Sequence, residues 1–182
     1  MLEKYFKNAS EKFAMPFVLV LAKFRIKPKT VSILGLIIVL LGSYFFYVDN
    51  KFLGIILIFL GSAVDGLDGP YARYQNLVSE KGAVLDSFID RLGELFIWSV
   101  VAIGFTSNDI ELFIVLSILV ASNLIPYIRA KSESYGITNK AGITARPERV
   151  IFAVIFMFFD LDYVFMYIYC LLYTSPSPRD LK

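Results

Sequence analysis

Long apolar stretches separated by short polar links constrain the fold of this chain more than any other feature. A helix needs about 20 apolar residues to cross the hydrocarbon core of a bilayer. Candidate stretches lie at about 31–48, 52–64, 83–105, 110–128, 150–159 and 161–173. The hydrophobic fraction of the 182 residues is 57%, above that of an ordinary soluble domain. The pattern therefore predicts an all-α integral membrane fold with six transmembrane helices.

The segment before the first stretch has a different pattern. In residues 1–26, apolar side chains such as Phe6, Phe13 and Phe17 are interleaved with lysines such as Lys4. This mixture is typical of an amphipathic helix that lies in the membrane interface. The segment lacks the short apolar core and small-residue cleavage site of a signal peptide. We therefore expect an interfacial helix, followed by one membrane domain that reaches to about residue 169.

Residues 170–182 do not fit this domain. The stretch 161–173 is shorter than the roughly 20 residues that a span needs, and Pro176 and Pro178, which follow it, cannot continue a helix. Residues 170–180 also read, codon by codon, as the translation of a transposase-type sequencing adapter. A natural tail rich in serine and proline is the alternative. We expect a non-native tail and a longer natural sixth helix.

Basic residues are distributed unevenly over the links between the stretches. They cluster before the first stretch, at 23–29, and in the links after the second and fourth stretches. The opposite links, at 49–51, 107–111 and 160–162, contain one basic residue, Lys51. Because cytoplasmic loops carry an excess of Lys and Arg, we expect the N-terminus and the basic links to face the cytoplasm. The expected location is the plasma membrane, spanned several times.

Four aspartates stand where the second and third stretches meet. Asp65 and Asp68 are spaced i, i+3, and Asp86 and Asp90 are spaced i, i+4, so each pair lies on one helix face. The short connection between the two helices predicts that they pack antiparallel and that the four carboxylates converge. Ionisable groups at membrane depth are kept mainly for function. The main alternative is that acidic residues at helix ends simply face water.

The residue types restrict what chemistry such a site can perform. The chain has no histidine and a single cysteine, Cys170, which excludes His-ligated and multi-Cys metal sites. Clustered carboxylates repel one another unless a cation lies among them, and oxygen ligands suit Mg²⁺, Mn²⁺ or Ca²⁺. Two such ions can bridge a diphosphate. Gly69, Ala72 and Gly82 are small residues that permit close approach to the backbone, although tight helix packing is another common reason for glycine.

The motif D-x2-D-G-x2-A-R-x8-G-x3-D-x3-D, from Asp65 to Asp90, resembles the signature of the CDP-alcohol phosphatidyltransferases. The resemblance covers most of the chain. It implies transfer of a lipid phosphate group from a CDP-linked lipid to an alcohol, with release of CMP. It also implies that Asp65, Asp68, Asp86 and Asp90 bind two Mg²⁺ or Mn²⁺ ions, and that Asp90 is the proton acceptor. The residues that it assigns to the CDP-lipid are Thr30, Gly69, Ala72, Arg73, Ser79 and Gly82.

The link between the fourth and fifth stretches bears on the acceptor. It resembles the inositol-phosphate branch of the family, bacterial or archaeal, in which basic residues of this region hold the phosphate of the acceptor. The candidates here are Arg129, Lys131, Arg146 and Arg149. The alternative is that these residues only reflect the excess of positive charge in cytoplasmic links. Glycerophosphate and serine remain possible acceptors.

Two other classes of membrane protein use clustered carboxylates. A prenyltransferase also binds diphosphate and Mg²⁺, but it needs more spans and does not explain Gly69, Ala72 and Arg73. A divalent-cation transporter predicts carboxylates near mid-membrane, whereas these lie at one end of their helices. The expected partners are a CDP-linked lipid, a small phosphorylated alcohol, membrane lipids and a second copy of the chain in a homodimer. No nucleic acid is expected.

Overall fold

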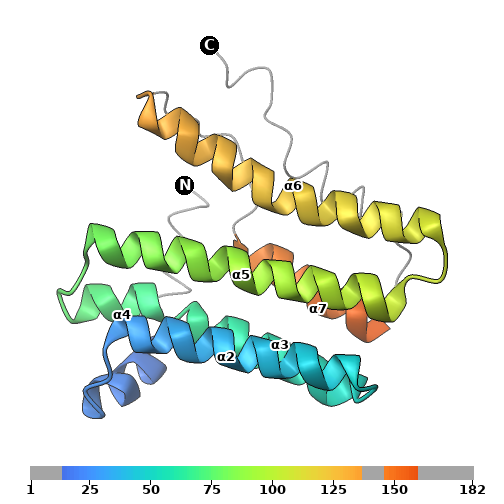
Figure 1. Ribbon diagram of the computed structural model, residues 1–182. Coiled ribbons are helices and arrows are strands. Elements are labelled where there is room, and N and C mark those ends of the chain that lie inside the picture. Colours follow the sequence, from blue (N-terminus) through green and yellow to red (C-terminus); the bar gives the residue numbers. More distant parts are fainter. Residues whose placement is uncertain (1–13, 137–145, 160–182) are drawn as a thin grey trace.

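The computed structural model describes residues 14–136 and 146–159. These residues form helices joined by short links, without any strand (Figure 1). The helices are Ala14–Lys23, α2 (Pro28–Tyr47), α3 (Lys51–Asp65), α4 (Asp68–Tyr74), α5 (Glu80–Phe105), α6 (Asp109–Ser134) and α7 (Arg146–Phe159). The predicted all-α class is confirmed for this part of the chain. The first half of the expected interfacial helix, residues 1–13, lies outside the described residues, as do the sixth stretch and the expected non-native tail.

Three helical segments in the described part are long and apolar enough to cross a membrane. They are Pro28–Tyr47, Lys51–Tyr74 and Asp109–Ser134. α5 has 26 residues, but six of its first 15 are ionisable: Glu80, Lys81, Asp86, Asp90, Arg91 and Glu94. α7 has 14 residues, fewer than the roughly 20 that a span requires. The structure therefore supports a helical membrane protein, whereas the count of six spans stays a prediction.

A tight turn reverses the chain between α4 and α5. After α4, Asn76 adopts a left-handed conformation with φ of 55°, which asparagine tolerates better than most residues. The N–H of Leu77 donates to the carbonyl of Ala72 (2.9 Å) and that of Asn76 to the carbonyl of Arg73 (3.2 Å). This pair of bonds is the Schellman motif that ends many helices. The chain therefore returns into α5 within a few residues of the end of α4.

Glycines bring α2 and α3 into close contact. A Cβ atom on Gly35 would lie 2.8 Å from the backbone nitrogen of Asp65, and one on Gly61 would lie 2.7 Å from the carbonyl oxygen of Gly35. Gly42 and Gly54 make equally close contacts further along the two helices. Small residues allow helix backbones to approach in this way. The last turn of α3, which ends at Asp65, is thereby held against α2.

The packing partners of α5 differ from the simplest expectation. α3 and α5 run antiparallel, as the short connection predicts (Figure 1). However, α5 packs chiefly against α2 and α6, whereas α3 packs against α2 and α7. The glycine contacts explain this arrangement, because they make α2 the nearest neighbour of α3. One apolar core, which includes Ile58, Val101, Ile118 and Phe156, joins all five long helices.

A second, smaller core fixes α4 and the N-terminal helix. Ala14 and Val18 pack with Val31 of α2 and Tyr71 of α4. The hydroxyl of Tyr71, a residue that is 1% exposed, donates a hydrogen bond of 2.5 Å to the carbonyl of Ile26. α4 is therefore held both by apolar contact and by a bond to the segment that precedes α2.

Candidate active site

Three of the predicted aspartates meet at one end of the bundle, where α4 lies near the beginnings of α2 and α5 (Figure 1). Asp65 ends α3, Asp68 begins α4, and Asp86 lies in the second turn of α5. One carboxylate oxygen from each lies within 4.8 Å of the other two. Asp65 is 2% exposed and Asp68 is 9% exposed. The cluster is therefore built from buried carboxylates on one side and a half-buried carboxylate on the other.

The junction between α3 and α4 brings Asp65 and Asp68 to the same side. The N–H of Leu67 donates to the carbonyl of Val64 at 3.1 Å, which is the spacing of a tightened, 3₁₀-type turn. Gly66 and Leu67 keep right-handed helical dihedral angles, so α3 and α4 continue as a nearly unbroken helical segment. Residues three apart on such a segment are neighbours.

Ser32 is a residue of the candidate site that sequence reasoning missed. Its hydroxyl donates a hydrogen bond to Oδ2 of Asp68, although the two residues are 36 positions apart in the sequence. Ser32 is 3% exposed. A hydrogen bond of this kind orients a carboxylate that serves as a metal ligand. The available signal was a polar side chain at the start of the apolar first stretch, two residues after Thr30.

The donor set suits a hard divalent cation. Three carboxylates this close would repel one another strongly without a neutralising charge, and Mg²⁺, Mn²⁺ and Ca²⁺ prefer oxygen ligands. No other group of three or more potential ligands of this kind is found among the described residues. Asp65, Asp68 and Asp86 are therefore the residues that could hold such an ion.

Asp90 stands one helical turn after Asp86 but does not belong to the three-carboxylate cluster. Its side chain is 17% exposed, and its Oδ2 atom lies 4.0 Å from Nη2 of Arg91. The structure thus brings together three of the four aspartates that were expected to converge. The spacing of four residues still keeps Asp90 on the same face of α5 as Asp86.

The α4 residues assigned to the CDP-lipid border this cluster. A Cβ atom on Gly69 would lie 3.4 Å from Nη1 of Arg73, and no other heavy atom outside its own helix turn would be nearer. That distance is an ordinary contact with the mobile end of a side chain. Packing in the described structure therefore does not require glycine at this position. Arg73 is exposed and Ala72 is half-buried.

Ser79 and Gly82 have a structural role at the start of α5. The Ser79 hydroxyl accepts a hydrogen bond of 3.1 Å from the N–H of Gly82, so Ser79 is the N-cap of α5. A Cβ on Gly82 would lie 3.1 Å from the same hydroxyl oxygen. Thr30 is exposed in the first turn of α2. For these three residues, contact with a CDP group stays a prediction.

The candidate acceptor residues lie on two helices. Arg129 and Lys131 belong to the last turns of α6, and Arg146 and Arg149 to the first turn of α7. Lys131 is exposed, and its Nζ lies 5.0 Å from the centroid of the Tyr135 ring. The side chains of the three arginines lie outside what the structure describes. Whether the four groups converge therefore remains a prediction.

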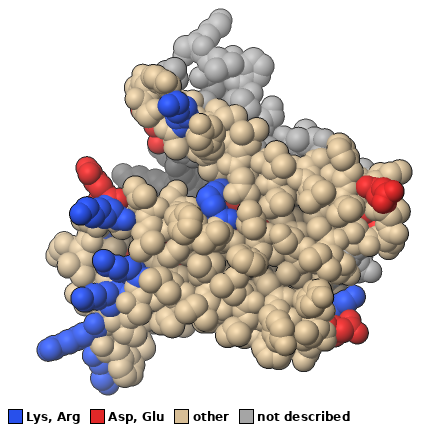
Figure 2. Space-filling model, in the orientation of Figure 1, with Lys and Arg blue, Asp and Glu red and all other residues tan. Residues whose placement is uncertain are grey.

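Basic side chains gather at the end of the bundle that contains the aspartates. Figure 2 shows most of the visible lysine and arginine at the end where α2 begins and α4 lies, with an acidic residue beside them, and mainly acidic residues at the opposite end. The exposed basic residues of this end include Lys23, Arg25, Lys27, Lys29 and Arg73. Such a surface attracts anionic groups, among them the diphosphate of a nucleotide-linked lipid.

Comparison with known protein families decides the class of this site. The family model described as CDP-alcohol phosphatidyltransferase matches residues 25–175. The chain belongs to this family. It is therefore a transferase of phospholipid biosynthesis, which moves a phosphatidyl-type group from a CDP-linked lipid to an alcohol. The match leaves no support for a prenyltransferase or a cation transporter.

Individual relatives agree with this assignment. An archaetidylinositol phosphate synthase from Pyrococcus horikoshii is 35% identical over 153 residues, which cover 84% of this chain and 80% of the relative. The crystal structure of phosphatidylinositol phosphate synthase from Mycobacterium tuberculosis with manganese and citrate is similar, with a TM-score of 0.75 and 26% identity. That match covers 92% of this chain and 87% of the other. The same enzyme with CDP-DAG bound matches with a TM-score of 0.68 and 25% identity, over 94% of this chain and 98% of the other.

Proposed function

We propose that this transferase uses an inositol phosphate as its acceptor alcohol. The observation that carries the proposal is the carboxylate cluster of Asp65, Asp68 and Asp86, at the same end of the bundle as a basic surface. Similarity to an archaetidylinositol phosphate synthase and to phosphatidylinositol phosphate synthases supports this choice of acceptor. Basic residues at the end of α6 and the start of α7 suit a phosphorylated acceptor.

We propose that two divalent ions, Mg²⁺ or Mn²⁺, are held by Asp65, Asp68, Asp86 and Asp90. Manganese in the related mycobacterial enzyme supports a divalent ion. When bound, such ions neutralise the charge of a diphosphate and stabilise the attacking and leaving oxygens. The CDP-lipid would lie over α4, where Gly69 leaves room for close approach and Arg73 can bind a phosphate. Thr30, Ala72, Ser79 and Gly82 complete the proposed CDP site.

Asp90 is proposed as the proton acceptor. The hydroxyl oxygen of the acceptor attacks the lipid-side phosphorus, the bond from that phosphorus to the CMP oxygen breaks, and CMP leaves. The proton of the hydroxyl passes to the carboxylate of Asp90. The chain contains no histidine that could take this proton, and Asp90 stands beside the cluster rather than within it. Positioning and electrostatic stabilisation supply the rest of the acceleration.

We further propose that the site faces the cytoplasm and that the enzyme lies in the plasma membrane as a homodimer. The basic residues at the aspartate end support this orientation, because positive charge marks the cytoplasmic side. In the helix Ala14–Lys23, Phe17, Leu19 and Val20 are exposed, which suits contact with lipid at the interface. Nothing in the proposed function calls for a nucleic acid.

The test is release of CMP by the purified enzyme in detergent. The reaction contains a CDP-linked lipid, Mn²⁺ and one candidate acceptor: inositol phosphate, glycerophosphate, serine or free inositol. Inositol phosphate should give the highest kcat/KM, and EDTA should abolish turnover because the carboxylates alone cannot neutralise the diphosphate. A higher kcat/KM for serine, glycerophosphate or free inositol would overturn the proposed acceptor. Full activity in EDTA would overturn the metal proposal. Diacyl and diether lipids are compared in parallel.

The basic residues at the start of α7 provide the second part of this test. Arg146→Ala and Arg149→Ala should raise the KM for inositol phosphate and leave the KM for the CDP-lipid unchanged. The control is Lys23→Ala, which removes a basic residue from the same end of the bundle but from another helix. If all three variants leave the acceptor KM unchanged, the arginines only define the topology.

A further inference from the structure

Pro126 lies inside α6 and interrupts the hydrogen bonding of this helix. Proline has no N–H, so the carbonyl of Ser122, four residues earlier, lacks its normal donor from within the helix. Arg91 of α5 supplies a donor instead, with its Nη1 atom 3.0 Å from this carbonyl oxygen. Buried carbonyl groups are rarely left without a donor. A side chain of α5 therefore completes the hydrogen bonding of α6.

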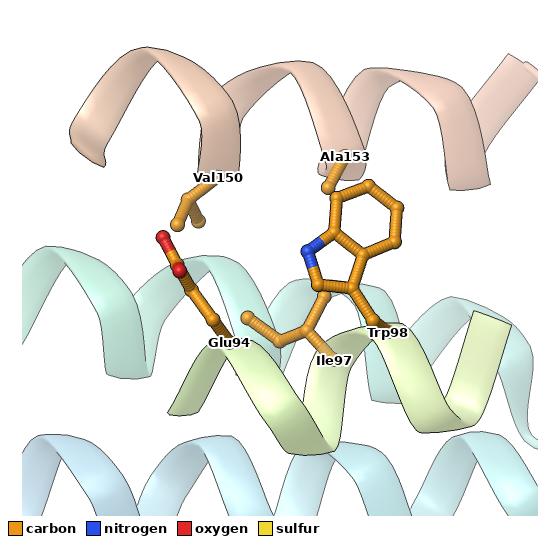
Figure 3. Close-up of a pocket in the computed structure, with 5 residues that line it drawn as sticks. All are labelled: Glu94, Ile97, Trp98, Val150 and Ala153. Atoms are coloured by element: carbon orange, nitrogen blue, oxygen red, sulfur yellow. The ribbon is translucent and has the colours of Figure 1, made fainter. Parts of the chain in front are cut away.

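The same guanidinium group also binds Glu94. Nη1 of Arg91 lies 3.1 Å from Oε2 of Glu94, whose side chain is 3% exposed. Figure 3 shows Glu94 beside Trp98 of α5, opposite Val150 and Ala153 of α7, around a small pocket. A buried carboxylate without a cation would be strongly destabilising. Arg91 thus provides an ion-pair partner for the buried Glu94 at the surface where α5 faces α7.

The third contact of Arg91 leads to the active site. Its Nη2 atom lies 4.0 Å from Oδ2 of Asp90, the proposed proton acceptor. On the other side of Arg91, α6 continues from Ser122 through Pro126 to Lys131, and α7 begins four residues before Val150. The C-terminal end of α6 and the N-terminal end of α7 carry the candidate acceptor residues. One side chain therefore contacts Asp90 and α6 directly, and it reaches the surface that faces α7 through Glu94.

We propose that Arg91 is a positioning residue that keeps the acceptor-binding ends of α6 and α7 in register with Asp90. This inference rests on the proposed function, because it concerns how the acceptor reaches the proton-accepting carboxylate. An arginine suits the task, since its planar group offers several donors in fixed directions at once. A lysine has a single compact ammonium group and cannot reproduce the three directions together. Arg91 acts on the reaction through Asp90 and α6, without touching the substrate.

The test compares two variants that both avoid an uncompensated charge beside Glu94. Arg91→Lys keeps the charge but not the geometry, and the paired Arg91→Gln/Glu94→Gln removes both charges at once, which buried pairs tolerate better than loss of one partner. Both should raise the KM for the acceptor about 10- to 100-fold, because the helix ends expected to bind the acceptor would be displaced. The KM for the CDP-lipid and the affinity for Mn²⁺, measured by electron paramagnetic resonance, should stay within about twofold.

The control variant is Lys51→Gln, which removes an exposed basic residue at the opposite end of the bundle, where α3 begins. An unchanged acceptor KM in both test variants would overturn the inference. So would a parallel rise of both KM values with weaker Mn²⁺ binding, because Arg91 would then support the whole site. The assay uses whichever acceptor the wild-type enzyme prefers. If that acceptor is not inositol phosphate, the proposed acceptor fails while the positioning role of Arg91 is still tested.

Discussion

The two aspartate pairs of the active site are held in different ways. Asp65 and Asp68 are buried where the glycine contacts bring α2 and α3 together, and Ser32 binds Asp68 directly. Asp86 and Asp90 are half-buried on α5. This helix packs against α6 and carries the ion pair of Arg91 and Glu94. Close-packed backbones allow little adjustment, whereas long charged side chains can change rotamer. We therefore expect Asp65 and Asp68 to be held rigidly, and we call this part of the site its rigid base. Asp86 and Asp90 should have more freedom to adjust their positions.

This difference separates the effects that substitutions should have. A change near Asp65 or Asp68 alters the ligand geometry, and we expect it to appear first in metal affinity or folding. A substitution on α5 after Asp86 leaves the three-carboxylate cluster intact. We expect its effect in the turnover rate or in the KM for the acceptor. The predictions below test this division.

The largest effect is expected from Asp90→Asn. An asparagine can still offer one oxygen to a metal but cannot accept a proton. Loss of a general base usually costs about 10²–10⁴ in rate. We therefore expect kcat, measured as CMP release, to fall by that factor while the CDP-lipid still binds. Asp65→Asn serves as the comparison, because it should weaken Mn²⁺ binding as well as turnover. Near-normal CMP release from Asp90→Asn would refute the assignment of the base.

A smaller effect is expected from Ser32→Ala, which removes the hydrogen bond to Asp68. Loss of a residue that orients a metal ligand typically lowers metal affinity about 10- to 100-fold. We expect a weaker affinity for Mn²⁺ in a direct titration, with activity restored at high Mn²⁺. The matched control is Ser43→Ala, a serine of the same helix that is 5% exposed. Equal Mn²⁺ affinity in the two variants would show that Ser32 does not orient Asp68.

The sequence alone predicted much of the site because its main signals are local. The spacings Asp65 to Asp68 and Asp86 to Asp90 depend only on helix geometry, and the structure brings Asp65, Asp68 and Asp86 together. The apolar stretches likewise mark the positions of α2, α5 and α6, since burial in lipid or core leaves a continuous pattern. The Schellman turn at Asn76 lies in the connection that was expected to be short between the second and third stretches.

Contacts between distant segments could not be derived in this way. The bond from Ser32 to Asp68 depends on how α2 lies on α4, which no spacing encodes. Gly35 and Gly61 were visible as small residues, but only the structure shows that each meets the other's helix. Pro126 leaves the carbonyl of Ser122 without its usual donor. The donor that replaces it, Arg91, lies 31 residues from Ser122, a separation that no local spacing reveals.

The smallest effects are expected when two glycines are compared, Gly61 in the rigid base and Gly69 beside the CDP site. A Cβ on Gly61 would lie 2.7 Å from the backbone of α2. Neither helix backbone can move aside without a loss of packing energy. Gly61→Ala should therefore destabilise the fold by about 1–3 kcal/mol, seen as a lower midpoint of thermal unfolding in detergent.

Gly69→Ala should behave in the opposite way. Its Cβ would make only an ordinary contact, 3.4 Å from the end of Arg73, and alanine favours a helix over glycine by up to about 1 kcal/mol. The unfolding midpoint should therefore stay the same or rise slightly. The added methyl group would occupy the space proposed for the CDP group, so the KM for the CDP-lipid should rise a few-fold while Mn²⁺ affinity is unchanged. A lower midpoint with an unchanged KM would assign Gly69 to packing, and the two glycines would then not differ in role.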